Sequence, residues 1–406
     1  MFLRLALRNL WRNRSRSIIT LLSIGSGCVA IILAGGFIEH AVNHLRESYI
    51  NDFIGHLRVY QPGYLQNNSL HPFDYMISTP EPIIEKIKAT EHVLYVAPRL
   101  SFSGLLSNGD STLSLFVEGV DPQIETPQKN ASHVDEGHYF EANNPYQILL
   151  GKGLTQALGA HVGDSLVLVT NTTRGALNAS DLFVQGIFST GDKTFDDHSA
   201  RIPLRTAQML LRTASIQMLV VFIDHTALTS QVKSNLEMNL KADSMDVKAW
   251  YELDQADFVL KAIAFYKRIF LVLKTIIIFV VALSVVNTMN MAVVERIGEI
   301  GTMMALGTRR GGIIRLFILE GLVMGILGGI LGCLAGIILA RLLSIVGIPM
   351  PTPPGTTAHW IARFIVKSDV CIAAIIMSMI TAVFASVLPA IKASRLDLGD
   401  ALRHNI

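Results

Sequence analysis

Four long apolar segments divide this chain, and they are unevenly spaced. The first, 17–38, has no charged residue in 22 positions, which is long enough to cross the ~30 Å hydrocarbon core of a bilayer as a helix. The other three follow one another near the C-terminus, at 269–294, 313–343 and 370–391. The pattern predicts an α-helical membrane protein with four transmembrane helices and one large polar domain inserted between the first and the second.

The composition agrees with this layout. Half of the residues are hydrophobic and only 16% are charged, and the mean hydropathy is +0.43, which exceeds the norm for soluble globular domains. A net charge of +2 gives no reason to expect nucleic acid as a partner. The three cysteines, Cys28, Cys333 and Cys371, all fall within predicted spans. We therefore expect an inserted domain without disulfides, and thiols that serve as small packing groups.

Basic residues gather at three points and indicate the orientation of the chain. Five arginines and no acid precede the first span, and four arginines surround the connection between the second and third spans. Lys392, Arg395 and Arg403 follow the last span. By the positive-inside rule these segments face the cytoplasm, so both termini are expected there and residues 39–268 on the opposite side. A cleaved signal peptide is the alternative, but its apolar core is usually only about 7–15 residues.

The polar stretches divide further by their periodicity. Apolar residues continue at helical spacing after the first span and again from Glu252 onward, which predicts a helical stalk on each side of the inserted domain. The stalks either carry motion or act as static supports, and the sequence leaves both open. Short alternating strands and turns between them predict a mixed α/β domain. The expected order is an amphipathic cytoplasmic helix 1–16, span 17–38, stalk 39–55, α/β domain 56–250, stalk 251–268, span 269–294, cytoplasmic segment 295–312, span 313–343, outer loop 344–369, span 370–391 and cytoplasmic tail 392–406.

Glycines recur every four residues in the third span. Small residues at this spacing let helices approach closely in lipid, so we expect this span to pack tightly against others, within one subunit or between two. The helix-packing glycines are Gly321, Gly325, Gly328, Gly329, Gly332 and Gly336.

A search for catalytic constellations finds little. The sequence has no phosphate-binding loop, no metalloprotease helix motif, no nucleophile elbow and no cysteine–histidine zinc spacing. The pair Asp196–Asp197 with His198 is predicted to be a turn between strands. We expect no catalytic residue, no metal and no cofactor in this chain, so energy for any work has to come from a partner.

The connection after the second span carries the most specific signal. It holds charged residues close to the membrane, punctuated by glycines, which suits a docking element for a soluble protein. Its sequence resembles the signature of the FtsX/MacB/LolC–LolE permeases, the non-ATPase subunits of mechanotransmitting ABC systems. The matching residues are Glu295, Arg296, Glu299, Ile300, Gly301, Ala305, Gly307, Phe317, Glu320 and Gly321.

The resemblance extends over nearly the whole chain. Residues 148–164 and 186–208 are similar to the periplasmic core domain of that family, and 7–14 to its N-terminal segment. The ending 389–403 is also similar, although Leu398-Gly399 replaces the family's usual Pro-x. The fold that this implies is a MacB-like core domain on helical stalks, in a multi-pass protein of the bacterial inner membrane with its large domain in the periplasm.

The resemblance also implies a mechanism and partners. A cytoplasmic ABC ATPase dimer, which itself binds ATP and Mg, would dock on two permease subunits, identical or related, through the segment after the second span. Glu295, Arg296 and Glu299 are then the expected docking residues, with Ile300, Gly301, Ala305 and Gly307 shaping the ATPase-coupling element. The alternative is that the charged residues only cap the adjoining helices.

The family resemblance indicates the mechanism more closely than it indicates the cargo. Relatives release lipoproteins toward a periplasmic carrier, drive tripartite efflux through an adaptor, or control periplasmic hydrolases. By analogy with the family, whose first and second spans would open laterally to an acyl chain, we favour lipoprotein or other lipid-anchored cargo. MacB-like efflux and FtsX-like hydrolase control are the alternatives. A periplasmic ligand sensor is an alternative from a different class, disfavoured because the chain shows no cytoplasmic output domain.

Overall fold

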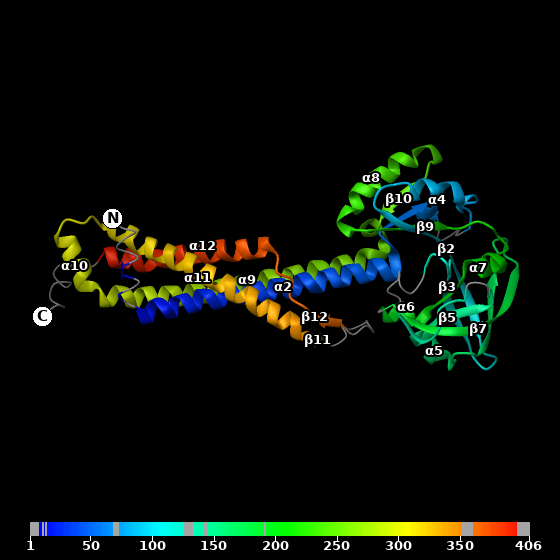
Figure 1. The fold of residues 1–406 in the computed structure, drawn as a ribbon, viewed down its shortest axis with the longest axis horizontal. Helices are drawn as coiled ribbons and strands as arrows, with labels where there is room; N and C mark the ends of the chain where they lie inside the picture. Colours follow the sequence, from blue (N-terminus) through cyan, green and yellow to red (C-terminus); the bar gives the residue numbers. More distant parts are fainter. Residues whose placement is uncertain are drawn as a thin grey trace. The chain divides into compact units, whose positions relative to one another are not determined.

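The structure, a computed structural model, describes residues 8–9, 12, 14–67, 73–125, 133–141, 144–190, 192–350 and 360–395 (Figure 1). The chain forms two compact units. The first, called the helical unit here, comprises Met1–Asn43, Ala262–Met350 and Ile361–Ile406. The second, the sheet unit, comprises His44–Lys261 and Pro351–Trp360.

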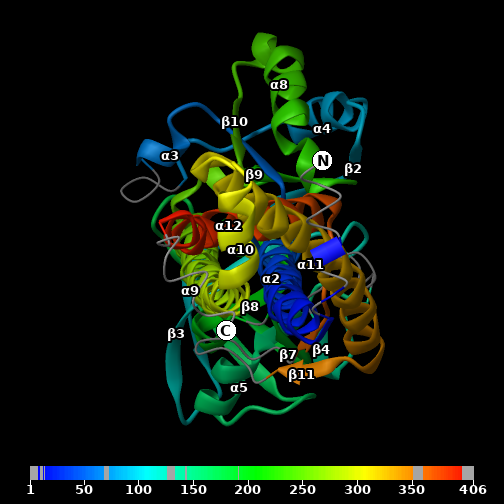
Figure 2. The same cartoon turned by 90° about the vertical axis from the view of Figure 1, so that its left-hand side faces the viewer.

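The described part of the helical unit contains four helices that are long and apolar enough to cross a membrane, seen end-on in Figure 2. They are α2 (Arg14–Tyr49), α9 (Asp257–Glu295), α11 (Arg310–Val346) and α12 (Ser368–Ser394). The short helix α10 (Ile297–Ala305) joins α9 to α11. A two-stranded sheet of β11 (Ile348–Met350) and β12 (Trp360–Ala362) lies between α11 and α12 in the sequence. The predicted class, four membrane helices with an inserted α/β domain, is confirmed.

The glycines of α11 lie on two faces of the helix. A methyl group added at Gly325 would lie 2.8 Å from the Cα of Met379 in α12. One added at Gly332 would lie 2.6 Å from the carbonyl oxygen of Gly25 in α2. Gly321 and Gly329 also face α12, whereas Gly328 and Gly336 face α2. The absence of side chains along both faces thus lets α11 pack backbone to backbone between two neighbours.

Helix α9 is much less covered than its neighbours. Only 11% of its most apolar stretch is buried, compared with 44% for α2 and for α11. Its exposed side chains include Phe279, Leu283 and Met291. In a bilayer, lipid or another protein covers such a surface.

The sheet unit contains one ten-stranded sheet with the order β10-β1-β9-β2-β3-β8-β5-β7-β4, in which β6 pairs with β2 and β7. Its longest strand, β2, changes partner along its length: Val93–Arg99 pairs with β9 and Leu100–Ser107 with β3. The strands are β1 (Leu57–Tyr60), β2 (Val93–Ser107), β3 (Thr112–Val120), β4 (His133–Gly137), β5 (Gln147–Gly151), β6 (Ser165–Asn171), β7 (Leu177–Ser189), β8 (Ser199–Pro203), β9 (Met218–Ile223) and β10 (Asp246–Ala249).

Two hydrophobic cores support this sheet, one for each half of β2. Side chains of α4 and α8 cover the half around β1, β9 and β10, and side chains of α5 and α7 cover the half around β3, β5 and β6. The helices of the unit are α3 (Tyr64–Asn67), α4 (Pro80–Lys88), α5 (Lys152–Leu158), α6 (Lys193–His198), α7 (Leu204–Leu211) and α8 (Thr229–Asn239). Mixed α/β structure in this domain is therefore confirmed as well.

Two local features differ from the prediction, one in detail and one in kind. The stalk predicted over 251–268 is helical, but its helix begins at Asp254 and not at Glu252, and the 3₁₀ turns Trp250–Glu252 and Asp254–Ala256 precede α9. The reason is the extended backbone of Leu253 (φ −90°, ψ 138°), which interrupts the helix. The predicted turn at Asp196–Asp197 belongs to α6, because the carboxylate of Asp192 accepts the N–H groups of Thr194 and Phe195 and so starts a helix there.

Some predicted features fall outside the described residues. They are most of the amphipathic helix 1–16 and the tail from 396 onward. Of the first stretch, Arg8, Asn9, Arg12 and residues 14–16 are described and are helical.

Candidate functional site

The segment between α9 and α11 is a helix flanked by two backbone breaks. Arg296 (φ −105°, ψ 15°) leaves the helical conformation, so α9 ends at Glu295 and α10 begins at Ile297. After α10, Gly307 takes a positive φ of 92°. A residue with a side chain would be strained in this backbone conformation, although a Cβ added at Gly307 would have no atom within 4 Å. The glycine is therefore required by the turn and not by crowding.

One face of α10 packs on the helical bundle. Ile300 is 4% exposed and lies in a core with Phe317 and Val293, and Gly301 beside it is buried. The chain on the other side, at Ala305 and Gly307, is exposed. Leu306 between them is 83% exposed. The segment therefore presents the exposed apolar side chain of Leu306 at the end of a helix whose opposite face, with Ile300 and Gly301, is buried in the helical bundle.

Arg296 lies inside the helical unit and not on the surface of α10. Its guanidinium is 2.9 Å from a carboxylate oxygen of Glu320 in α11, and the two side chains are 9% and 3% exposed. Asn9 donates its side-chain amide to the same Glu320 oxygen at 2.7 Å, and its carbonyl accepts from Arg296 at 3.4 Å. Arg296 thus joins three segments of the chain where their backbones meet.

Glu295 and Glu299 are also paired within the chain. Glu295 forms an ion pair with Arg16, and Glu299 forms one with Arg12. Both glutamates remain about half exposed, so each pair contributes at most about 1 kcal/mol to stability and leaves carboxylate surface accessible. Together with Arg296–Glu320, these pairs connect the N-terminal residues to both ends of the α9–α10 junction.

Several residues of this site had no role in the sequence prediction. Glu320 matched a family motif without an assigned function, and Leu306, Asn9, Arg12 and Arg16 were not selected as site residues. A signal for Glu320 was present, because an acidic residue inside an apolar span usually marks a functional position. No signal identified its partners, since Asn9 is 311 residues away in the sequence.

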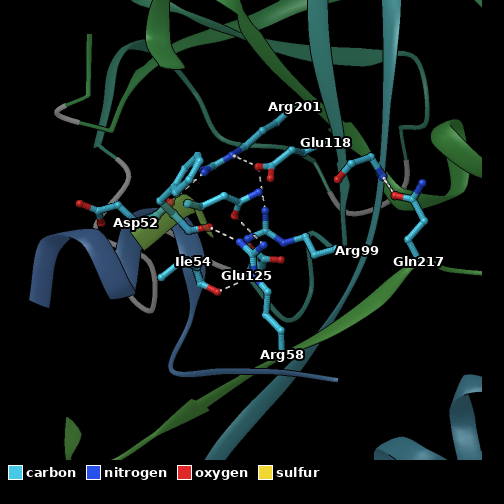
Figure 3. Close-up of polar contacts among 11 residues, drawn as sticks. Asp52, Ile54, Arg58, Arg99, Glu118, Glu125, Arg201 and Gln217 are labelled. Carbon is cyan, nitrogen blue, oxygen red and sulfur yellow. Dashed lines mark hydrogen bonds and ion pairs between the residues drawn. The ribbon is translucent and has the colours of Figure 1, made fainter. Parts of the chain in front are cut away.

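The sheet unit holds a second buried cluster of charges (Figure 3). Arg99 pairs with Glu118 at 2.8 Å and with Glu125 at 2.6 Å, and Arg201 lies 3.4 Å from Glu118. Burial favours the neutral acid at Glu118, but Arg99 and Arg201 outweigh it and hold its pKa below the ordinary value. Every charge here has a charged neighbour, so the cluster reads as a structural network within the domain.

A hydrogen-bonded chain begins at His56, which is 4% exposed. Its Nδ1 accepts the N–H of Ile223 at 3.4 Å, and its Nε2 lies 3.1 Å from the hydroxyl of Thr226. That hydroxyl donates to Glu47 at 2.7 Å. Burial lowers the pKa of His56 to about 4, in keeping with a neutral ring that accepts at one nitrogen.

Among the described residues, no group of three or more His, Cys, Asp and Glu side chains is arranged to hold a metal ion.

Comparison with known proteins places these features in a family. A model of the FtsX-like permease C-terminal domain matches residues 271–398, and a model of the MacB-like periplasmic core domain matches residues 17–238. The lipoprotein-releasing system transmembrane protein LolC of Neisseria meningitidis is 26% identical over 77% of this chain and 75% of its own length.

Two further proteins match this chain, one by sequence and one by structure. An uncharacterized ABC transporter permease of Bacillus subtilis, YvrN, is 26% identical over 99% of both chains. The periplasmic region of MacB from Actinobacillus actinomycetemcomitans is 12% identical, with a TM-score of 0.37 over 54% of this chain and 98% of that one. Since the core-domain model alone covers more than half of the sequence and the permease model covers the last three membrane helices, the protein belongs to the FtsX/MacB/LolC family of ABC transporter permeases.

Proposed function

We propose that this permease is driven by a separate cytoplasmic ATPase dimer that docks on α10 and the turn after it. The observation that carries the proposal is the build of α10. It presents the 83% exposed Leu306 and the half-exposed Glu299, while Ile300 and Arg296 anchor its other face in the bundle. A rigid helix with an exposed apolar tip suits insertion into a groove of a partner.

The anchoring also supports a route for force. The Arg296–Glu320 pair ties the base of α10 to α11, and the pairs of Arg12 and Arg16 tie it to the start of the first membrane helix. A push on α10 would therefore move α2, α9 and α11 together. Both α2 and α9 continue as single helices from the helical unit into residues of the sheet unit. In this mechanism they are the rods that transmit motion to the periplasmic core domain.

For the orientation we propose that α10 and both termini lie in the cytoplasm and the sheet unit in the periplasm of a bacterial inner membrane. The basic residues that flank the α10 side of the spans support this orientation. The uncovered apolar face of α9 fits a second permease subunit, identical or related.

For the cargo we propose a lipid-anchored lipoprotein, passed to a periplasmic carrier. The support is similarity to a protein named as part of a lipoprotein-releasing system. If the chain does not release lipoproteins, efflux or control of periplasmic hydrolases would be its function instead.

The docking proposal is tested with the complex purified gently from its native membrane. We expect an ATPase subunit to co-purify with the wild-type chain, and Leu306→Asp to abolish both its retention and ATP hydrolysis by the complex. The matched control is Leu331→Asn, an exposed leucine in the membrane part of α11. Retention of an active ATPase by Leu306→Asp would overturn the docking surface, and absence of any ATPase from the wild-type preparation would favour the sensor.

The cargo proposal is tested on the same preparation. Mass spectrometry should find an acylated lipoprotein whose recovery is lost when its lipidated cysteine is replaced. A periplasmic adaptor or hydrolase without a lipoprotein would contradict lipoprotein release and leave the docking proposal intact.

A further inference from the structure

The sheet unit contains a cleft of about 600 Å³ at the point where β2 changes partner from β9 to β3. It is lined by side chains of β1, α3, β2, β3 and β9 and of the 3₁₀ turn 254–256. Its volume is within the range of small-molecule sites in proteins, about 300–1,000 Å³. All of its lining residues belong to the sheet unit, so the cleft does not depend on the placement of the helical unit.

Several aromatic side chains line the cleft. Tyr60 and Tyr64 stack with their ring centroids 5.1 Å apart and their planes 12° from parallel. Phe102 and Phe116 also line the cleft; Phe116 is 41% exposed, whereas Tyr60, Tyr64 and Phe102 are buried. Rigid aromatic side chains that line a cleft suit the apolar or aromatic body of a ligand.

The cleft also holds a buried cation whose hydrogen-bond partners are all neutral. Arg58 lines it and is only 6% exposed. Its guanidinium donates to the carbonyl oxygen of Ile54 at 2.8 Å (Figure 3). It also donates to the carbonyl oxygen of Phe53 at 3.2 Å and to the side-chain oxygen of Gln255 at 2.8 Å. Within the described part of the chain, no carboxylate lies at ion-pair distance from Arg58.

This arrangement differs from that of the neighbouring arginine. Arg99, which also lines the cleft, has both Glu118 and Glu125 as partners. Arg58 has only neutral acceptors, which use three of the five N–H donors of its guanidinium, and Glu118 acts on its charge only from beyond ion-pair distance. A buried charge is costly unless an opposite charge compensates it, and a bound anion would supply that charge and accept the remaining donors.

From these observations we infer that the cleft is a binding site for an organic anion with an aromatic or apolar body. Arg58 holds the anionic head, a carboxylate or sulfonate, and the aromatic side chains of Tyr60, Tyr64, Phe102 and Phe116 hold the body. The anion comes either from the C-terminus of a peptide or from a free aryl acid, which share this chemistry. The site is separate from ATPase docking, and its occupancy is measurable with no nucleotide or ATPase present.

The test is titration calorimetry on the full-length protein in lipid nanodiscs, with empty nanodiscs subtracted. The peptide probe is N-acetyl-Phe-Phe, compared with its C-terminal amide, and the second probe is naphthalene-2-sulfonate. We expect at least one of the two anions to bind. The anion that binds shows whether a peptide or a free aryl acid is the preferred source. If the peptide acid binds, its C-terminal amide should bind at least about tenfold more weakly.

Variants assign the binding to the cleft. Arg58→Gln should weaken anion binding at least about tenfold, whereas Arg205→Gln, at an exposed arginine of α7, should leave it unchanged. Since loss of Arg58 could unfold the domain, Phe116→Ser provides a second test at a half-exposed position, and thermal denaturation of each variant monitors folding. Phe116→Ser should weaken binding of every probe that binds.

Three outcomes would overturn the inference. The first is that neither anion binds at up to about 1 mM, and the second is that the peptide acid and its amide bind equally. The third is that Arg205→Gln weakens binding as much as Arg58→Gln does.

Discussion

The two units of this protein differ in the residues that fill their interiors: large aliphatic residues in the sheet unit and glycines along α11 in the helical unit. The core of the sheet unit consists of large aliphatic residues, such as Leu106, Leu150 and Leu168, each 0% exposed. In the helical unit many of the leucines of α11 face outward, and glycines occupy its buried faces. The difference follows from the solvent. Water drives large apolar groups inward, whereas lipid is as apolar as leucine, so membrane helices gain stability from close backbone packing.

Buried charges sharpen the contrast. In the sheet unit Glu118 has two arginines and Arg99 two glutamates, so the loss of one partner leaves another in place. In the helical unit Arg296 and Glu320 have each other as their charged partner, with Asn9 as a neutral one. The buried Arg296–Glu320 pair is therefore more vulnerable to the loss of one partner than the charge cluster of the sheet unit.

The largest effect is expected from breaking that pair. Glu320→Ala leaves the Arg296 cation buried and uncompensated, and should lower the free energy of unfolding by about 3–5 kcal/mol. The measurement is steric-trap or SDS-induced unfolding in bicelles. The double variant Arg296→Met/Glu320→Leu is the control, because it removes both charges and should recover most of the loss. A double variant as unstable as the single one would argue against an unpaired charge as the cause.

The same substitution should have different effects in the two units. Leu168→Ala empties part of the sheet-unit core and should cost about 2–5 kcal/mol of unfolding free energy. Leu331→Ala, at a position 55% exposed on α11, removes contacts with lipid only and should change stability by less than about 0.5 kcal/mol. Equal losses at the two positions would refute the comparison.

A pH dependence is expected from His56 in the sheet unit. Its pKa is about 4 in the folded protein and 6.5 in the unfolded chain. Between these values the unfolded chain binds a proton that the folded protein does not, so the free energy of unfolding falls as the pH falls from 6.5 to 4. The loss should reach about 3 kcal/mol and stop below pH 4, where both states are protonated.

The measurement is chemical unfolding as a function of pH. His56→Gln should flatten the dependence in this window, and His161→Gln, at a side chain 86% exposed, should preserve it. An unchanged pH profile in His56→Gln would show that another group is responsible.

A smaller effect is expected from filling a glycine face. Gly325→Leu places a side chain where a Cβ already lies 2.8 Å from the Cα of Met379, and should destabilise the helical unit by about 1–3 kcal/mol. Gly311→Leu is the control, since nothing lies within 4 Å of that position at the start of α11. If both variants were equally stable, α11 would not depend on its close contact with α12.

The sequence by itself determined the features that depend on local pattern. Runs of apolar residues predicted four membrane helices, alternation predicted the strands of an inserted α/β domain, and glycine spacing predicted a tightly packed third span. The same reasoning selected the segment 295–312, which contains α10. Local pattern is sufficient here because helix formation in lipid and strand formation at a sheet surface depend on residues within a few positions of one another.

Only the tertiary structure decided which of those residues meet. Arg296 was expected on a docking surface, but packing of α11 against the α9–α10 junction brings Glu320 to it and buries both. The partner switch of β2, and with it the cleft around Arg58, depends on strands far apart in the chain. Such contacts are fixed by how whole elements fill space, and no periodicity in the sequence records which distant side chain will supply the opposite charge.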